Sequence, residues 1–278
     1  MDRKSPEDYK ALVLEAFDTL FNQRDYAKAA TFWSEHYIQH SAHIPPGRDG
    51  LFDLVRSQPQ TLRYENALIM AEGNYLMLHG RFTGHASPRP WIALDIVTIE
   101  NGRLAEHWDV LQDEATQQES KSGRPMFGTS FAEPDNRPAP LTVDDARRIV
   151  APLYEALNEP SKKDVPALLA QAANSDYRSY STNDDWLTRD QLADVFKMIG
   201  AAVPDLRWTI EDILTVGDQI VVRGRATGTP VREFWGAQPT GKRFNTMAID
   251  IFTVKHGKLA SAYHVENWMT ALQQISKN

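Results

Sequence analysis

The most constraining feature of this chain is an internal repeat that spans whole domains. Residues 95–112 read DIVTIENGRLAEHWDVLQ and residues 250–267 read DIFTVKHGKLASAYHVEN, and the two segments align without a gap. Upstream, HGRFTGH at 79–85 and RGRATGT at 223–229 form a second pair in the same order. Because the period is far longer than the ~20–50 residues of solenoid repeats, the sequence predicts two copies of one domain.

The length fits this interpretation, because 278 residues hold two domains of roughly 100–150 residues each. We place the first domain at 1–131 and the second at 141–278. The sequence between the two repeats, GRPMFGTSFAEPDNRPAPL, is rich in Pro and Gly and lacks periodicity. Its stretch 132–140 is the predicted linker.

Composition narrows the class of partner. The net charge is −7 and no basic tract is present, which argues against nucleic acid or an anionic membrane as the main partner. The chain has no cysteine, so disulfides and thiolate metal sites are excluded. No apolar run is long enough to span a bilayer, and the start MDRKSPEDYK lacks the apolar core of a signal peptide. We therefore expect a cytoplasmic protein.

Each half places its helical patterns before its strand-like patterns. In the first half, helices are predicted at 6–22, 27–33 and 49–55. Four predicted strands follow, at about 61–71, 74–84, 91–100 and 103–112. The second half repeats this order at 142–157, 164–172 and 188–200, then about 205–216, 219–228, 243–255 and 258–267. Helices followed by an antiparallel meander predict an α+β fold, with helices packed on one face of a curved sheet.

The sharpest polar signal is the HWD segment in the last predicted strand of the first half. Side chains alternate along a strand, so His107 and Asp109 share one face and Trp108 points to the other. A carboxylate between apolar walls has a raised pKa, which suits proton abstraction next to a carbonyl, and a histidine can tune its charge or move protons. The alternative is a satisfied polar pair that lines a passive cavity.

Other polar residues of the first half are weaker candidates. Asp95 lies in the apolar strand WIALDIVTI, and the second copy has Asp250 at that position, which favours a structural task such as bonding to backbone or an arginine. His79 could donate a hydrogen bond to a substrate oxygen, and the second copy has Arg223 there. The alternative is that His79 and Arg223 lie on the solvent-exposed face of their strands. His40 follows the helical section, where we expect a pocket mouth.

The second half replaces the HWD pattern, since Ala262 aligns with His107 and His264 with Asp109. Its polar set is expected to line a second pocket and consists of Arg223, Asp250, Tyr263, His264 and Glu266. Unequal polar residues in two copies indicate one working and one altered pocket, and the HWD pattern favours the first. No HxxxH or HxH pair lies within one predicted helix or strand, so no metal site is predicted.

The element order, YIQHSAHIPPGRDG at 37–50 and the segment 95–112 resemble the SnoaL-like polyketide cyclase family, closest to its SnoaL-like aldol-condensation enzymes. The second half, with GRATGTPVREFWGAQPTGKRF and HVENW, resembles the ester-cyclase branch. This family belongs to the nuclear-transport-factor-two-like superfamily. The resemblance implies two tandem cone-shaped α+β barrels, a pocket aspartate acting without a cofactor, and sheet-to-sheet pairing that a tandem chain could form as an intramolecular pseudo-dimer.

Together these observations predict cofactor-independent acid–base catalysis on a small, moderately apolar carbonyl compound, such as an aldol or polyketide-type ring closure. Asp109 is the predicted base, His107 its partner, and His79 and His40 the predicted donors to the enolate oxygen. A hydratase or hydrolase using the same dyad is one alternative. A non-catalytic carrier of small molecules is another. Further homo-oligomerisation stays open.

Overall fold

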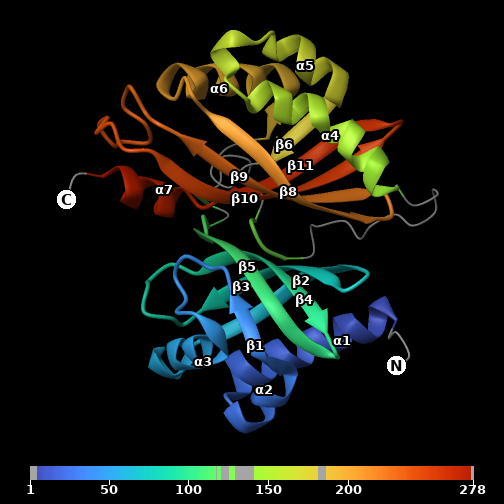
Figure 1. Ribbon diagram of the computed structural model, residues 1–278, viewed down its shortest axis with the longest axis vertical. Coiled ribbons are helices and arrows are strands. Elements are labelled where there is room, and N and C mark those ends of the chain that lie inside the picture. The colour runs from blue at the N-terminus through green and yellow to red at the C-terminus, as the bar shows by residue number, and fades with distance from the viewer. Residues whose placement is uncertain (1–4, 117, 120–124, 129–140, 181–185, 277–278) are drawn as a thin grey trace. The chain divides into compact units, whose positions relative to one another are not determined.

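The computed structural model describes residues 5–116, 118–119, 125–128, 141–180 and 186–276 (Figure 1). These residues divide into two compact units. Unit 1 holds the described residues 5–116 and 125–128, and unit 2 holds 118–119 and 141–276. The predicted linker, 132–140, lies outside the described residues. No helix in the described ranges is both long and apolar enough to cross a membrane.

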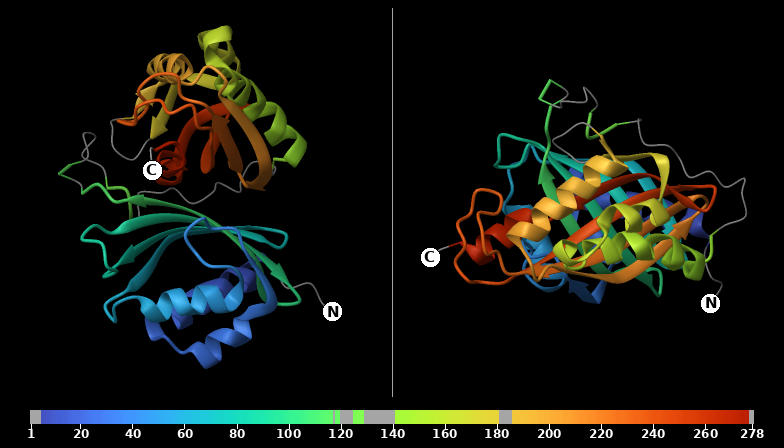
Figure 2. Two further views of the ribbon diagram at one scale, coloured as in Figure 1. Left: turned by 60° about the vertical axis from the view of Figure 1, so that its left-hand side comes forward. Right: turned by 90° about the horizontal axis from the view of Figure 1, so that it is seen from above.

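Unit 1 is a mixed five-stranded sheet with helices on one side (Figures 1 and 2). Its helices are α1 (Pro6–Phe17), the π-helix η1 (Asp18–Gln23), α2 (Tyr26–Phe32) and α3 (Gly47–Ser57). Its strands are β1 (Trp33–Gln39), β2 (Arg63–Glu72), β3 (Tyr75–Thr83), β4 (Trp91–Glu100) and β5 (Arg103–Asp113). The sheet order is β1-β5-β4-β3-β2, in which β1 runs parallel to β5 and the remaining pairs are antiparallel.

Unit 2 repeats this plan. Its helices are α4 (Val143–Leu157), the 3-10 helix η2 (Pro160–Lys162), α5 (Val165–Ala172), α6 (Arg189–Ala202) and α7 (Trp268–Ile275). Its strands are β6 (Ala173–Tyr180), β7 (Leu187–Thr188), β8 (Arg207–Val216), β9 (Gln219–Gly228), β10 (Phe244–Lys255) and β11 (Lys258–Glu266). The sheet order is β7-β6-β11-β10-β9-β8, with β6 parallel to β11.

The predicted α+β class and the tandem plan are confirmed. One part of the expectation is wrong, because both sheets are open and neither closes into a barrel. The parallel strands β1 and β6 were also not predicted. Their burial does not alternate simply from residue to residue, so they lack the period-2 pattern that marks a half-buried strand.

Local sequence explains where the main helices begin. Ser5 and Asp8 form a reciprocal capping box at the start of α1, and Thr142 and Asp145 form the same device at α4. Each pair satisfies two backbone N–H groups that a helix start would otherwise leave without partners. The two copies therefore begin their first helix with the same chemistry.

A matched asparagine in each unit ties the end of the helical section to the sheet. The Tyr64 N–H donates to Asn22 Oδ1 at 2.8 Å, and Asn22 Nδ2 donates to the Tyr64 carbonyl at 3.0 Å. In unit 2, the Trp208 N–H donates to Asn158 Oδ1 at 2.7 Å, and Asn158 Nδ2 donates to the Trp208 carbonyl at 3.4 Å. The duplication thus extends to individual hydrogen bonds.

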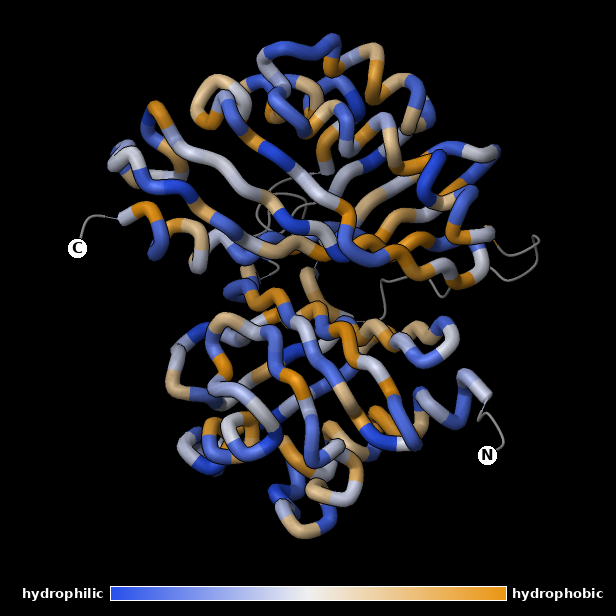
Figure 3. Tube along the Cα trace, viewed as in Figure 1, coloured by the Kyte–Doolittle hydropathy of each residue, from blue (hydrophilic) through white to orange (hydrophobic). Residues whose placement is uncertain are grey.

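Each unit buries its core between its helices and the facing side of its sheet. Hydrophobic and hydrophilic positions alternate along many strands, as Figure 3 shows. In unit 1, Phe17 and Phe52 from the helices pack with Trp33, Leu78 and Val97 from the sheet. The corresponding cluster of unit 2 includes Tyr154, Phe196, Val222, Phe244 and Phe252. Polar side chains in the middle of these inner sheet faces therefore lie among apolar groups.

Candidate acid–base sites

A β-bulge brings three polar residues of unit 1 onto one sheet face. Near the turn, Glu100 pairs with Arg103, but beyond a register shift Asp95 pairs directly with Asp109. Without that shift Asp95 would lie opposite Trp108 and point away from His107. Instead, Asp95, His107 and Asp109 all face the helices.

These three side chains form a compact, enclosed cluster. Each offers one ligand atom within 4.8 Å of the others. Asp95, His107 and Asp109 are only 2%, 6% and 3% exposed, respectively. Asp95 Oδ2 and Asp109 Oδ1 are buried without a hydrogen-bond partner among the described residues. Two carboxyl groups and one imidazole therefore share a site from which water is largely excluded.

The proton on the His107 ring can be assigned from its neighbours. Gln39 Oε1 accepts the Ser41 backbone N–H at 2.9 Å and lies 2.9 Å from His107 Nδ1. Since that oxygen can only accept, Nδ1 carries a proton and donates it to Gln39. The other ring nitrogen, Nε2, lies 3.0 Å from Asp95 Oδ1. Something positive, a proton or a cation, must therefore sit between Nε2 and this carboxylate.

Within the cluster, burial and the contact between Asp95 and His107 shift the pKa of each of these two residues in opposite directions. Burial raises the pKa of Asp95, and its hydrogen bond to His107 opposes that rise without cancelling it. Burial lowers the pKa of the His107 imidazole, but the hydrogen bond to Asp95 and the charges of Asp109 and Asp95 outweigh it, so the net pKa is raised. The cluster therefore favours binding positive charge. Histidine nitrogen and carboxylate oxygen also make these residues possible metal ligands.

Unit 2 places a different set at the equivalent position. After a register shift matching that of unit 1, Asp250 pairs with His264, and Glu266 pairs with Ala248. Tyr154 on α4 donates its hydroxyl to Asp250 Oδ2 at 2.5 Å. The other carboxylate oxygen, Oδ1, lies 3.7 Å from His264 Nδ1. One oxygen of Asp250 is thus held by tyrosine, and the other faces a histidine.

The Asp250 site is less enclosed than the unit 1 cluster. The side chain of His264 is 25% exposed and that of Asp250 is 11% exposed. Burial raises the pKa of Asp250 to about 6, although His264 and Tyr154 act to lower it. Beyond His264, Glu266 accepts a hydrogen bond from Trp268 Nε1 at 2.5 Å. The result is a carboxyl group that titrates near neutrality beside a partly open edge.

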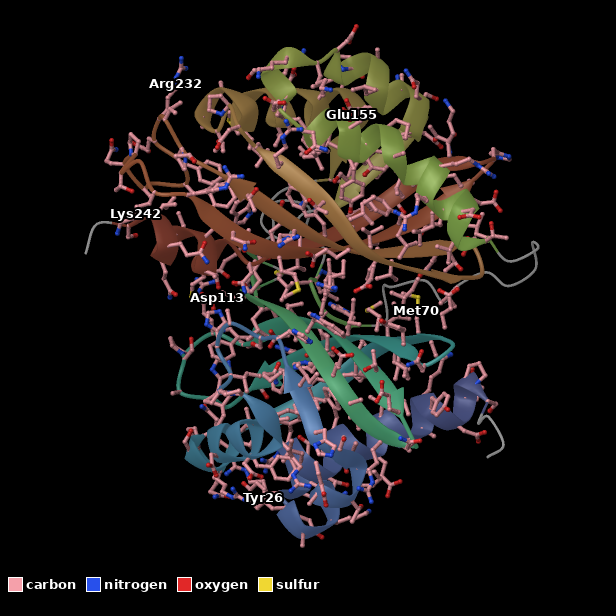
Figure 4. All side chains as sticks on the ribbon, viewed as in Figure 1. Tyr26, Met70, Asp113, Glu155, Arg232 and Lys242 are labelled. Atoms are coloured by element: carbon pink, nitrogen blue, oxygen red, sulfur yellow. The ribbon has the colours of Figure 1, made fainter. Side chains whose placement is uncertain are left out.

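The segment 229–245, which follows β9 and aligns with only the shorter HASPRP of the first half, lies next to Trp268. Its Phe234 ring packs against Trp268 at 5.2 Å between centroids, and Trp235 lies 6.2 Å from the same ring. Trp235 is 54% exposed. Arg232 and Lys242, labelled in Figure 4, mark the edge that this insertion forms. An aromatic group with solvent access therefore lies beside Trp268, the residue that donates to Glu266.

The structure does not bring His79 to Asp109. His79 pairs with Leu94, whereas the neighbouring Leu78 pairs with Asp95, so His79 lies on the opposite sheet face. There its ring is 5.7 Å from that of Phe127. Burial lowers the pKa of the His79 imidazole to about 4, which keeps it neutral.

His40 also lies apart from Asp109. Its ring stacks on Trp108 at 4.4 Å, and its Nε2 is 2.9 Å from Glu106 Oε2. Trp108 alternates with His107 and Asp109 along β5, so His40 sits on the face away from the cluster. In this geometry neither His40 nor His79 can hold the oxygen of a substrate bound at Asp109.

Two residues predicted for the second pocket also lie elsewhere. Arg223 pairs with Ile249, on the face opposite Asp250. Its guanidinium donates to Asp212 at 2.7 Å and to Glu211 at 2.5 Å. Tyr263 alternates with His264 and stacks on Tyr180 at 4.6 Å. Of the predicted set, the structure therefore brings together Asp250 and His264, with Glu266 on the same face.

Sequence reasoning missed two residues that complete these sites. Tyr154 comes from a helix, and a tyrosine on the apolar side of a helix gives no sign that its hydroxyl reaches a carboxylate. Gln39 ends a strand that was not predicted. Asp95 was expected to bond backbone or an arginine, and its partner is His107.

Comparisons with known proteins agree with this architecture. A family model described as SnoaL-like polyketide cyclase matches residues 149–275, and one described as SnoaL-like domain matches residues 13–107. No curated protein sequence matches the chain. The predicted resemblance of the second half to the ester-cyclase branch is not confirmed by these matches and stays a prediction.

Several solved structures resemble one half of the chain. TsrD from Streptomyces laurentii is 22% identical with a TM-score of 0.43, covering 48% of this chain and 96% of TsrD. Wild-type IdmH from Streptomyces antibioticus is 25% identical with a TM-score of 0.41, covering 46% and 95%. A protein from Jannaschia sp. CCS1, provisionally described as a SnoaL-like polyketide cyclase, is 18% identical with a TM-score of 0.45, covering 52% and 99%.

Proposed function

Because the chain belongs to the SnoaL-like family and consists of two such domains in tandem, we propose that it catalyses acid–base chemistry on a carbonyl-containing small molecule, with Asp250 of the second domain as the base. The reaction class is carbon–carbon ring closure next to a carbonyl. The description of the model that matches residues 149–275, polyketide cyclase, supports this class for the second domain.

One observation carries the proposal: the two oxygens of Asp250 are unequal. Tyr154 holds Oδ2, which fixes the plane of the carboxyl group, while Oδ1 faces His264 at the partly exposed edge. A general base needs one oriented lone pair that a substrate can reach. The pKa of Asp250, raised by burial to about 6, leaves the group ionised at neutral pH and still basic enough to take a proton.

The reaction would proceed in two proton transfers. Asp250 Oδ1 takes the proton from the carbon next to the substrate carbonyl, and the electron pair moves to the carbonyl oxygen as an enolate. A His264 N–H is placed to donate to that oxygen. The enolate carbon then attacks a second carbonyl in the same molecule, and the new alkoxide takes the proton back from Asp250. The base is regenerated, and only side chains of this chain take part.

The sequence favoured Asp109, and the geometry favours Asp250. Asp109 and its partners are almost fully enclosed, whereas the side chain of His264 is 25% exposed. A substrate therefore reaches Asp250 with less rearrangement. One observation keeps Asp109 as a second candidate base: its buried Oδ1 has no hydrogen-bond partner among the described residues.

Two variants of the full chain test this choice. Wild type, Asp250→Asn and Asp109→Asn are assayed against a panel of β-diketones and β-keto esters for loss of substrate and release of a cyclised product. Asp250→Asn keeps the shape of the side chain and removes the base, so turnover is expected to fall by ~10²–10⁴-fold with binding retained. Asp109→Asn is expected to cost far less.

The other outcomes separate the alternatives. Loss of turnover in Asp109→Asn together with full turnover in Asp250→Asn assigns the base to the first domain. Water added to the product, with no ring formed, identifies a hydratase or hydrolase. Saturable binding of these compounds with no turnover in the wild type identifies a carrier.

A further inference from the structure

We propose that Asp95, His107 and Asp109 of the first domain bind one divalent cation of the manganese, iron or zinc class. This site is separate from the Asp250 site and does not depend on the function proposed for it. Its ligands come from two neighbouring strands, β4 and β5.

The spacing of the donor atoms suits a shared ion. The three ligand atoms lie within 4.8 Å of one another, and His107 Nε2 is 3.0 Å from Asp95 Oδ1. Two ligands at right angles around an ion, each with a bond of ~2.1 Å, are ~3.0 Å apart. The pair therefore already has the separation of adjacent ligands in an octahedral site. Asp109, directly opposite Asp95, supplies the third donor.

Two of the carboxylate oxygens point to a missing partner. Asp95 Oδ2 and Asp109 Oδ1 are buried and accept no hydrogen bond from a described residue. A buried carboxylate oxygen without a donor loses its hydration and gains nothing in return. A cation bonded to both carboxyl groups would offset the charge that burial leaves on each of them.

The His107 ring is already oriented as a ligand. Gln39 Oε1 takes the Nδ1 proton, and the Ser41 N–H holds Gln39 in turn. In metal sites the ligating histidine usually donates its second ring N–H to an oxygen in this manner, which fixes the tautomer and the direction of the lone pair. With the Nδ1 proton held in this way, Nε2 faces Asp95 Oδ1 at 3.0 Å, and a cation bound there would take the place of a proton between the two atoms.

The charges also call for a cation. Two ionised carboxylates and an imidazole protonated on Nδ1 alone carry a charge of −2, which a divalent cation neutralises. The ion pair within the cluster joins Asp95 and His107, and no lysine or arginine among the described residues pairs with either aspartate. A mixed nitrogen and oxygen set without sulfur favours manganese, iron or zinc over copper(I).

The second domain supplies a matched control, because it keeps the aspartate and lacks the cluster. Ala262 stands where the first domain has His107. Asp250 Oδ2 is occupied by the Tyr154 hydroxyl, and His264 Nδ1 is 3.7 Å from Oδ1. The metal site therefore belongs to the first domain alone.

The test measures binding directly and needs no substrate. Because the site is enclosed, the full chain is unfolded in guanidinium with a chelator, freed of both, and refolded with Mn²⁺ or Co²⁺. Bound Mn²⁺ is counted by electron paramagnetic resonance after removal of free ion. We expect one ion per wild-type chain, one in Asp250→Asn, and at least a hundredfold weaker binding in Asp109→Asn and His107→Gln.

A second variant covers the case in which Asp109→Asn does not refold, as judged by circular dichroism. Gln39→Leu removes only the partner of His107 Nδ1 and should weaken binding by ~10–100-fold, as loss of an outer hydrogen-bond partner does in other metal sites. In the Co²⁺ form, paramagnetically shifted histidine proton signals should appear in the wild type and be absent from His107→Gln. The proposal would be overturned if refolded wild type held no stoichiometric ion at millimolar Mn²⁺. It would also be overturned if neither His107→Gln nor Gln39→Leu changed the stoichiometry. In either case, protons would neutralise the cluster.

Discussion

Replacing Asp250 by asparagine should make the stability of the second domain less dependent on pH. Burial raises the folded-state pKa of Asp250 to about 6 from its ordinary value of 3.8. Well below pH 3.8 the group is protonated in both states and costs nothing. Between pH 4 and 6 the unfolded chain releases this proton while the folded chain keeps it, so stability falls as the pH rises.

The size of the effect follows from the shift. At ~1.4 kcal/mol per pKa unit, a shift from 3.8 to about 6 corresponds to about 3 kcal/mol of stability lost above pH 6. The substituted asparagine stays neutral at every pH, and its side-chain oxygen can still accept the Tyr154 hydroxyl. The free energy of unfolding of Asp250→Asn minus that of the wild type should therefore rise by about 2 kcal/mol between pH 4 and 7, since part of the change has already occurred at pH 4.

Urea denaturation followed by tryptophan fluorescence, repeated at half-unit steps from pH 4 to 7, measures this difference. Asp194→Asn, which removes an exposed carboxylate on α6, is the matched control for the loss of one carboxylate, and the pH dependence should be larger for Asp250→Asn. A constant difference between wild type and Asp250→Asn across this range would refute the reasoning, because burial would then not penalise the ionised form of Asp250.

Two further predictions concern packing and hydrogen bonding. A Cβ added at Gly80 would meet the Tyr64 ring at 2.3 Å, whereas one added at the equivalent Gly224 has its nearest neighbour at 3.5 Å. Thermal unfolding should therefore show Gly80→Ala destabilised by ~1–3 kcal/mol and Gly224→Ala nearly unaffected; equal effects would contradict the contact. Asn158→Ala leaves the Trp208 N–H without its acceptor and should cost ~1–3 kcal/mol in urea denaturation. Asn158→Asp, which keeps an acceptor for that N–H, should recover part of this loss, and no recovery would contradict the assigned role.

Much of the fold follows from the sequence. The gapless match of 95–112 with 250–267 predicts the duplication, and alternation of apolar residues predicts the antiparallel strands of each meander. Whether a sheet stays open or closes into a barrel depends on the whole sheet, so no local sequence pattern predicts that both sheets are open. The parallel strands β1 and β6 escaped prediction because their residues do not alternate simply between buried and exposed.

The sites were predictable only in part. The HxD spacing places His107 and Asp109 on one face, and the structure agrees. Whether Asp95 joins them depends on the bulge beyond the turn, since a shift of one residue exchanges the two faces of a strand. Nothing in the segment ENGRLAEH specifies that bulge. For the same reason, the sequence did not show that His79 and Arg223 lie on the sheet face opposite Asp95 and Asp250. No sequence pattern pointed to Tyr154.

The pH dependence of kcat/KM in wild type and Tyr154→Phe tests most directly whether Asp250 is the base. Wild-type kcat/KM should rise tenfold per pH unit and level off above a midpoint near the Asp250 pKa of about 6, because the base must be ionised. The hydrogen bond from Tyr154 lowers this pKa, so Tyr154→Phe should move the midpoint to higher pH. A midpoint that stays in place when Tyr154 loses its hydroxyl would contradict the assignment of Asp250 as the base.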